Sequence, residues 1–364
     1  MTVWWITLAS SYLLCLIARS TGEIVYQQGR YTEKCNKVFS FMAMAVLILV
    51  AGLRNGIGDT EIYMDGFKTA PSTIAASIKM LVNKSMKDNG FYFIEGIIKT
   101  IKDDEHFFIF VISAITISLI FMTYYKYSEY LELSIYLFIT TGCYLVTMNG
   151  IRQYLASAIL FFVFPMIEKR NWKVYIPIVL ICSMIHKSAL IFLPLYFLVN
   201  QKAWGKVTKW ILVAGIILYI TYPVTGPILA NALGESQYGE YKSALMSTGS
   251  GANMIRVLVM SVPIVLSYIG REYLKGKEKY YNIIVNFSVV NLIFILLATK
   301  FWIYARFNMY FSVYMIMLII WCIRYLFDET NRKIIYILCM FFYFIYYWYE
   351  MVMSLGQTYI GLFF

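Results

Sequence analysis

Long runs of apolar residues, separated by short polar stretches, recur along the whole 364-residue chain. At a rise of 1.5 Å per residue, runs of about 12 to 18 residues give helices that cross all or part of a hydrocarbon layer roughly 30 Å thick. The pattern predicts an all-α, polytopic membrane protein with about 12 transmembrane or half-spanning helices. These helices are expected over residues 3–18, 38–53, 107–123, 131–148, 154–167, 174–185, 188–199, 210–222, 254–270, 282–299, 307–323 and 334–349.

Composition strengthens this interpretation, because hydrophobic residues make up 60% of the chain and charged residues only 14%. A soluble core cannot absorb so many apolar side chains. The length alone would allow two soluble domains, but a ring of helices uses the same length as one unit. We therefore expect residues 1–364 to form a single polytopic membrane domain.

The net charge of +11 is compatible with nucleic-acid binding, but the lysines and arginines gather in loops at helix ends. There they set the orientation and contact lipid headgroups, so we expect membrane lipids and no nucleic acid as partners. The long loops 54–106 and 224–253 fall on the opposite, extracytoplasmic side, where the N-terminus also begins. The short basic loops, predicted to be cytoplasmic, are 19–37, 168–173, 200–209, 271–280 and 324–333.

The apolar stretch LICSMIHKSALIFLPLYF, residues 180–197, is interrupted by His186 and Lys187. A single helix over 174–199 would reverse the side of every later loop. Two short segments joined at His186 keep all the basic loops on one side, so we expect a hairpin. Its polar tip would then lie below the outer surface, where protein or a water-filled cavity must surround it.

Three arginines are also predicted on this outer side, which is normally poor in positive charge: Arg54, Arg152 and Arg306. Each is compatible with a side chain that reaches the lipid headgroups. Together with His186 they indicate a site that binds a phosphate group, because the planar guanidinium matches pairs of phosphate oxygens.

The first outer loop begins LRNGIGDTEIYMDGF, with Gly58 and Asp59 directly after an apolar helix. The glycine permits a tight turn, and an ordinary helix exit is one interpretation. Oxygen ligands from Asp59, Glu61 and Asp65 for a divalent metal are another, although their spacing fits no strong motif.

Residues 87–108 of the same loop predict an amphipathic helix that lies along the membrane surface. The side chains expected to face the membrane are Phe91, Phe93, Ile94, Ile97, Ile98 and Ile101, and those expected to face water are Glu95, Lys99 and Lys102. Near the predicted site, Tyr63, Gln153, Tyr154 and Tyr304 supply rings and polar groups suited to sugars.

Five sequence blocks, in this order, resemble the Wzy-type bacterial surface-polysaccharide polymerases of the EpsG family. They are GLRNGIGDTEIYM (52–64), GFYFIEGIIK (90–99), MNGIRQYLASAILFF (148–162), IHKSALIFLPLYF (185–197) and ARFNMYFSVY (305–314), and they extend over most of the chain. The resemblance implies a multi-pass protein of the bacterial cytoplasmic membrane, with an architecture like that of the all-helical C-type glycosyltransferases.

The resemblance further implies that oligosaccharide repeat units linked to polyprenyl pyrophosphate are joined at the outer face, with polyprenyl pyrophosphate as the leaving group. A flippase and a chain-length regulator of the same pathway are implied partners, and no cofactor or metal is expected. In this chemistry Arg152 and Arg306, then Arg54, hold the pyrophosphate with help from Lys187. His186 is the candidate base for the acceptor hydroxyl, and Asp59 is the alternative.

Other classes of function remain open on the sequence. A ligase that transfers finished polysaccharide would use the same donor chemistry. A flippase or other transporter would carry charged residues at several depths, whereas the candidate residues here gather on one side, which favours chemistry. An O-acyltransferase with a membrane histidine lacks a second supporting motif. The polar, glycine-rich loop 224–253 is expected to form a mobile cover over the acceptor route.

Overall fold

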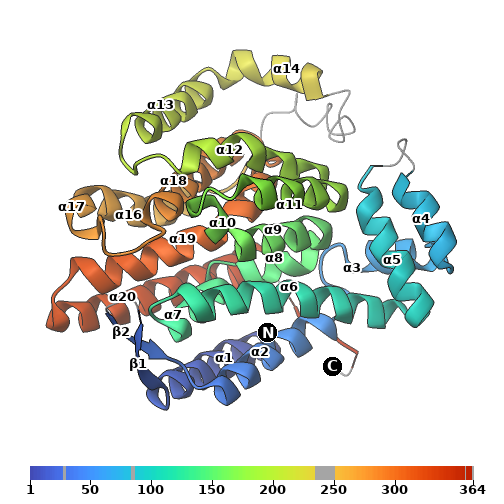
Figure 1. Ribbon diagram of the computed structural model, residues 1–364, viewed down its shortest axis with the longest axis horizontal. Helices are drawn as coiled ribbons and strands as arrows, with labels where there is room; N and C mark the ends of the chain where they lie inside the picture. The colour runs from blue at the N-terminus through green and yellow to red at the C-terminus, as the bar shows by residue number, and fades with distance from the viewer. Residues whose placement is uncertain (28–29, 83–86, 234–250, 357, 363–364) are drawn as a thin grey trace. The chain divides into compact units, whose positions relative to one another are not determined.

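The computed structural model describes residues 1–27, 30–82, 87–233, 251–356 and 358–362. It is almost entirely helical, as the apolar runs predict (Figure 1). The one sheet within the described residues is a short antiparallel hairpin of β1 (Glu23–Gln27) and β2 (Arg30–Lys34), with Glu23 opposite Lys34. It lies in a segment that the basic pattern predicted only as a loop. The chain packs as two compact units. That residues 1–364 form a single membrane domain stays a prediction.

Unit 1 comprises Met1–Phe164, Lys173–Leu190 and Phe327–Phe364. Among its helices, α1 packs against α2 and α7, and α6 packs against α2 and α9. The elements are α1 (Thr2–Ser20), the β hairpin, α2 (Lys37–Gly52), α3 (Thr60–Lys68), α4 (Ile74–Val82), α5 (Asn89–Ile101), α6 (Glu105–Tyr127), α7 (Leu131–Thr140), α8 (Cys143–Asn149), α9 (Ile151–Val163), most of α11 (Trp172–Ile185), the start of the 3₁₀ helix η1 (Lys187–Ile191), α20 (Glu329–Trp348) and the π-helical turn η3 (Tyr349–Ser354).

Several helix boundaries follow from single residues. The Asp104 carboxylate accepts hydrogen bonds from the backbone N–H groups of His106 and Phe107, and so caps α6 two residues before the predicted start. Gly142, at φ 82°, breaks the predicted helix 131–148 into α7 and α8, which meet at a bend of 56°. The apolar run therefore has the expected bounds but forms a bent pair.

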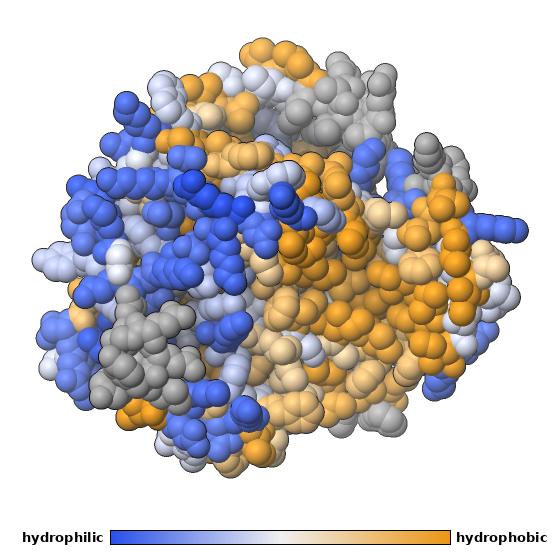
Figure 2. Space-filling model, viewed as in Figure 1, coloured by the Kyte–Doolittle hydropathy of each residue, from blue (hydrophilic) through white to orange (hydrophobic). Residues whose placement is uncertain are grey.

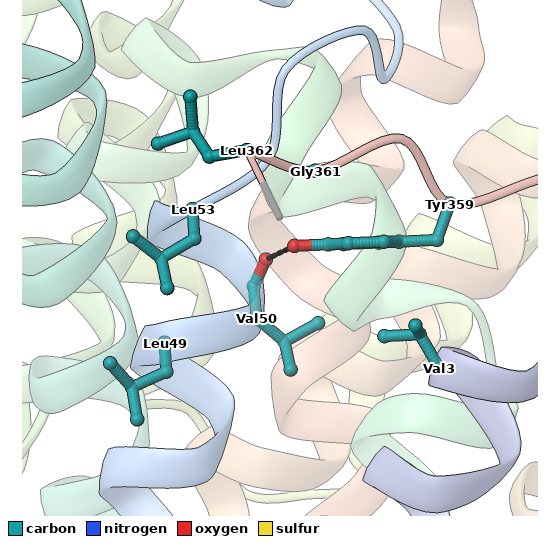
Figure 3. Close-up of a pocket in the computed structure, with 7 residues that line it drawn as sticks. All are labelled: Val3, Leu49, Val50, Leu53, Tyr359, Gly361 and Leu362. Atoms are coloured by element: carbon teal, nitrogen blue, oxygen red, sulfur yellow. Dashed lines mark hydrogen bonds between the residues drawn. The ribbon is translucent and has the colours of Figure 1, made fainter. Parts of the chain in front are cut away.

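One end of unit 1, here named the loop end, gathers the start of α1, the end of α2 and the C-terminal segment. Figure 3 shows Val3, Leu53 and Tyr359 around an apolar pocket, with the Tyr359 hydroxyl donating to the carbonyl of Val50 at 2.9 Å. The Leu362 N–H also donates to the Leu53 carbonyl at 3.0 Å. The first predicted outer loop thus starts beside both chain ends.

The opposite end, here named the hairpin end because β1 and β2 follow α1 there, is tied by a buried carboxylate. Glu132 of α7 is fully buried, and its Oε1 lies 3.0 Å from Arg19 Nη1 of α1. Tyr336 of α20 donates to the same oxygen at 3.2 Å. The helices α1, α7 and α20 therefore meet at this end, while their other ends lead toward the loop end.

Unit 2 comprises Pro165–Trp172 and Ile191–Leu326, and its centre is the pair α18 and α19. The rings of Phe287 and Tyr314 stack across this pair with centroids 4.3 Å apart, and the Asn308 side chain donates to Asn291 Oδ1 at 2.6 Å. The elements are α10 (Pro165–Glu168), α12 (Phe192–Val199), α13 (Lys206–Ile220), α14 (Tyr222–Leu233), α16 (Met254–Ile269), α17 (Arg271–Leu274), α18 (Tyr281–Ala298) and α19 (Tyr304–Leu326).

Five helices in the described part of the chain are long and apolar enough to cross a membrane, or six if the bent pair α7 and α8 is one span. The five are α1, α6, α18, α19 and the continuous segment Glu329–Ser354. Shorter apolar helices, including α2, α9, α11 and α16, accompany them. The protein is therefore a polytopic membrane protein, as predicted.

The lipid-facing surface is visible in unit 1. Apolar side chains such as Ile6 of α1 and Phe41 and Leu49 of α2 are exposed. Figure 2 shows a broad apolar surface over α2 and α6 and more hydrophilic side chains around β1 and β2. An apolar band of this kind is what a helix bundle presents to hydrocarbon.

The two long predicted outer loops are partly helical in the structure. Within 87–108, Glu95 is only 2% exposed and the Lys99 side chain 7%, whereas Ile101 is 72% exposed. The assignment of Glu95 and Lys99 to a water-facing side was wrong, because α5 packs on α3, α4 and α6. In the second loop, the first residues, up to Leu233, belong to α14 (Tyr222–Leu233). Residues 234–250 lie outside the described residues, so the mobile cover over the acceptor route stays a prediction.

Candidate functional site

A single carboxylate, that of Asp88, joins the two sequence-distant residues that the sequence singled out most clearly. Its Oδ2 lies 3.1 Å from His186 Nδ1 and 3.3 Å from Arg152 Nη1. Its Oδ1 accepts a hydrogen bond from the backbone N–H of Lys187 at 3.0 Å. The predicted meeting of Arg152 and His186 is therefore present within unit 1.

Local backbone geometry sets the position of this carboxylate. Asp88 precedes the first turn of α5 in the left-handed conformation, at φ 55°, which aspartate tolerates better than most residues. The Asn89 side chain donates to the Leu81 carbonyl at 2.6 Å and so fixes the turn to α4. A Cβ on Gly90 would lie 2.8 Å from Met184 Cβ and 2.9 Å from its carbonyl carbon, so only glycine lets α5 approach α11 this closely.

The hydrogen bond at Nδ1 determines which nitrogen of His186 is free. Burial alone would raise the pKa of Asp88, but its hydrogen bonds and charge contacts with His186, Lys187 N–H and Arg152 lower that pKa below its ordinary value. An ionised carboxylate can only accept, so Nδ1 must carry the hydrogen. In the neutral ring Nε2 then has a lone pair, and among the described residues it has no hydrogen-bond partner.

Arg152, at the start of α9, lies against two aromatic rings. Its Cζ is 5.5 Å from the ring centroid of Tyr63 in α3 and 5.8 Å from that of Phe91 in α5. These two rings meet edge to face, with centroids 6.0 Å apart. The guanidinium is thus held by cation–π contacts and by Asp88, and its side chain stays 32% exposed. It is positioned but still open to an anion.

A second acid of α5 acts on the same arginine. Glu95 lies one helical turn after Phe91, and its Oε2 is buried with no hydrogen-bond partner among the described residues. Burial raises its pKa to about 7, and the charge of Arg152 partly opposes that rise. The site therefore contains one carboxyl that stays ionised and one that titrates near neutral pH.

The first outer block contacts the block that carries Arg152. The Asp59 N–H donates to Asn149 Oδ1 at 3.1 Å, while the Asp59 side chain is half-buried at the start of α3. Gly58 has φ 56°, and a Cβ there would lie 2.6 Å from Asn149 Oδ1. The glycine is therefore required for a close approach as well as for the turn. This contact also places Arg152 at the loop end.

Arg54 is used inside unit 1. It is 1% exposed, and its Nε and Nη1 donate to Thr60 Oγ1 and Ser113 Oγ at 2.9 Å and 2.7 Å. Nη1 also donates to the Ala51 carbonyl, and Nη2 is buried with no partner among the described residues. These bonds join the end of α2 to α3 and α6. Arg54 therefore holds helices of unit 1 together.

The other predicted residues of unit 1 differ in access. The Lys187 side chain is exposed beside His186. Gln153 and Tyr154, by contrast, are 3% and 1% exposed within α9. Of the acids considered for a metal, Asp65 pairs with Lys68 at 2.9 Å. No group of three or more His, Cys, Asp or Glu side chains that could hold a metal ion occurs in the described part of the chain.

Arg306 and Tyr304 belong to unit 2, at the start of α19. Arg306 Cζ lies 5.5 Å from the ring centroid of Trp302, and Tyr304 meets Tyr222 edge to face at 6.3 Å. Their meeting with Arg152 and His186 stays a prediction. Likewise, the chain breaks at His186 as expected, between α11 and η1, and the folding back of the two halves stays a prediction.

Asp88 is the site residue that the sequence did not reveal. It stands in the segment KDNG, whose Asp-Asn-Gly order is typical of a turn before a helix. The available signal was its place one residue before an apolar helix in a predicted outer loop. Nothing in that local pattern indicates the histidine 98 residues later that it binds.

The fold and this cluster define a polytopic membrane protein with a histidine, an arginine and a buried carboxylate at one end of a helical unit. The family model described as the EpsG family matches residues 37–362, and the chain belongs to this family, which is associated with exopolysaccharide biosynthesis. The matched region contains the whole cluster. No curated protein and no solved structure matches the chain.

Proposed function

We propose that this protein is a polysaccharide polymerase that joins polyprenyl-pyrophosphate-linked oligosaccharide repeat units. The main support is that Arg152 and His186, which are 34 residues apart in sequence, both contact the carboxylate of Asp88. His186 Nε2 has no hydrogen-bond partner among the described residues. A base and an anion-binding group side by side are what a sugar transfer from a phosphate leaving group needs.

In the proposed reaction, a hydroxyl oxygen of the acceptor sugar attacks the anomeric carbon of the donor. The bond between that carbon and the phosphate oxygen breaks, and its electron pair leaves with polyprenyl pyrophosphate. His186 Nε2 accepts the hydroxyl proton, which balances the step without a cofactor. A single displacement of this kind inverts the anomeric centre.

Arg152 is the proposed partner of the leaving group, because its guanidinium is fixed by Tyr63, Phe91 and Asp88 and is still partly exposed. A donor fixed in advance stabilises developing charge without reorganisation. The exposed Lys187 adds a second positive charge beside the base, and we keep Arg306 as a further candidate for binding the pyrophosphate. We assign Arg54 to the scaffold and keep Asp59 as the alternative base.

We place the reaction at the outer face of the cytoplasmic membrane, in line with the predicted orientation. A flippase that delivers the lipid-linked unit and a regulator of chain length are the proposed partners. Beside Arg152, the half-buried ring of Tyr63 is the proposed sugar-binding surface.

The test gives purified protein in lipid vesicles a synthetic polyprenyl-pyrophosphate oligosaccharide and resolves the products by size. A ladder that grows by whole repeat units supports the polymerase. Arg152→Lys keeps the charge but loses the paired geometry, so we expect a fall in kcat/KM on the order of 10²-fold. Movement of the substrate across the bilayer without new glycosidic bonds would show a flippase, and transfer only to a foreign acceptor would show a ligase.

A further inference from the structure

We propose that Asp88 is a positioning residue of this site, which holds His186 in the tautomer whose Nε2 is free to accept a proton and aims Arg152 at the leaving group. This inference rests on the proposed function. Asp88 touches neither reacting atom; it acts through the two residues that do.

The contacts of Asp88 support its first proposed role, the selection of the His186 tautomer. Asp88 Oδ2 faces Nδ1 at 3.1 Å, while Oδ1 is held by the Lys187 N–H at 3.0 Å, so the carboxylate cannot turn away from the ring. Free histidine prefers the tautomer with hydrogen on Nε2. In that tautomer Nε2 has no lone pair and could not accept the proton of the acceptor hydroxyl. A carboxylate at Nδ1 reverses that preference and also stabilises the imidazolium formed during the reaction.

The second proposed role of Asp88 is to offset the positive charges of Arg152 and of protonated His186. His186 is 8% exposed, and Arg152 lies near it, so proton uptake at Nε2 would place two cations in a largely buried space. The Asp88 carboxylate, with 6% of its side chain exposed, lies between them and contacts both. It therefore offsets the charge that develops on the base while it keeps Arg152 in place.

A test that needs no activity uses the fact that the chain has only two histidines, His106 and His186. The imidazole nitrogens of ¹⁵N-histidine-labelled protein in lipid give separate NMR signals for protonated and bare nitrogens, and His106→Gln assigns the pair. We expect His186 to carry its hydrogen on Nδ1. Asp88→Gly removes the carboxylate but suits φ 55°, and in this variant we expect the hydrogen to move mainly to Nε2. The proposal is overturned if His186 of the wild-type protein carries its hydrogen on Nε2. It is also overturned if the tautomer of His186 is the same in Asp88→Gly as in the wild type.

The kinetic test uses Asp88→Asn, which keeps the size of the side chain and tolerates the left-handed backbone. We expect kcat to fall on the order of 10²- to 10³-fold with a smaller change in KM, because the oriented, charge-balanced base is lost rather than the binding surface. A merely structural Asp88 would leave Asp88→Asn with the wild-type kcat, and that result would overturn the inference.

The two proposals fail in different ways. If the wild-type protein makes no ladder but its His186 tautomer responds to Asp88→Gly, the function is wrong and the positioning holds. If the ladder forms and neither the tautomer nor kcat depends on Asp88, the function stands and the positioning is wrong. Asn89→Ala, which removes the bond to Leu81 and leaves Asp88 in place, is the matched control for loosening of the turn.

Discussion

Two buried acids, Asp88 just before α5 and Glu95 within it, both act on Arg152, but their surroundings give them different protonation behaviour. Asp88 has three hydrogen-bond partners, and its pKa is lowered. Glu95 has an unpartnered Oε2, and burial raises its pKa to about 7. At low pH the site therefore carries one negative charge beside Arg152, and above neutral pH it carries two.

Glu95 makes stability depend on pH in a direction opposite to that of a paired carboxylate. Its folded-state pKa lies above the unfolded value, so the native protein binds more protons between about pH 4.5 and 7, and stability falls as pH rises through about 7. Glu95→Gln stays neutral, so we expect it to raise the free energy of unfolding at pH 8 by on the order of 2 kcal/mol. Thermal unfolding in detergent at pH 5 and pH 8 measures this.

The control is Glu61→Gln in α3, an exposed carboxyl, which should leave both melting temperatures within about 1 °C of wild type. Equal loss of stability from pH 5 to pH 8 in wild type and in Glu95→Gln would contradict the assignment.

The sequence singled out two residues that the structure brings together, Arg152 and His186, but not the acids beside them. Arg152 and His186 were identifiable because a cation and an imidazole inside apolar runs need partners. Asp88 and Glu95 were not, because their roles depend on how α5 packs against neighbours distant in sequence. Helical periodicity alone placed Glu95 in water, and only tertiary packing shows that this side of α5 is covered.

At the scale of elements, the approach of α5 to α11 determines whether Asp88 reaches His186. Gly90 is the contact point, since a side chain there would collide with the backbone of Met184. We expect Gly90→Ala to displace the start of α5 and to lower kcat/KM at least 10-fold, although no charged or catalytic residue changes. Gly66→Ala in α3 is the matched control, because its Cβ would meet nothing within 4 Å, and we expect it to keep full activity. Wild-type activity in Gly90→Ala would show that the site does not depend on this contact.

The hairpin end has its own tie between elements. Arg19→Ala removes the cation that lies 3.0 Å from the fully buried Glu132 carboxylate. We expect the free energy of unfolding to fall by roughly 2–4 kcal/mol, because the loss of a cation beside a buried carboxylate costs more than the loss of a surface pair.

Lys333→Ala is its control, since the Lys333 and Glu329 side chains are 77% and 82% exposed and their pair at 3.9 Å should contribute less than about 0.5 kcal/mol. Thermal unfolding of the two variants side by side decides the matter, and equal stability would mean that Glu132 is satisfied in another way.

Most helices were predictable at this scale because apolar runs fix their existence, and α1, α2, α6, α18 and α19 begin and end within a few residues of the expected bounds. The bend between α7 and α8 was not, since it depends on one left-handed glycine in an otherwise continuous run. The β1–β2 hairpin was also missed, because its residues formed part of a basic loop in which charge outweighed any alternating pattern.

For the whole molecule, the structure places both chain ends and the start of the first long loop together at the loop end of unit 1. The orientation that the basic loops predict puts this end outside the cell membrane. We expect a cysteine at the exposed Lys187 to react with a membrane-impermeant maleimide added to intact cells, and a cysteine at the exposed Lys333 to react only after lysis. The reverse pattern would place the site on the cytoplasmic side and remove the proposed reaction.

In the proposed reaction, His186 Nε2 takes the proton of the acceptor hydroxyl while Arg152 holds the pyrophosphate. The most direct measurement is the rate of ladder formation by His186→Gln beside His106→Gln, each purified in lipid from the same host. We predict that His186→Gln loses on the order of 10²- to 10⁴-fold in kcat while it still binds the lipid-linked substrate, and that His106→Gln stays within about twofold of wild type. A His186→Gln protein that builds the ladder at the wild-type rate would contradict the account.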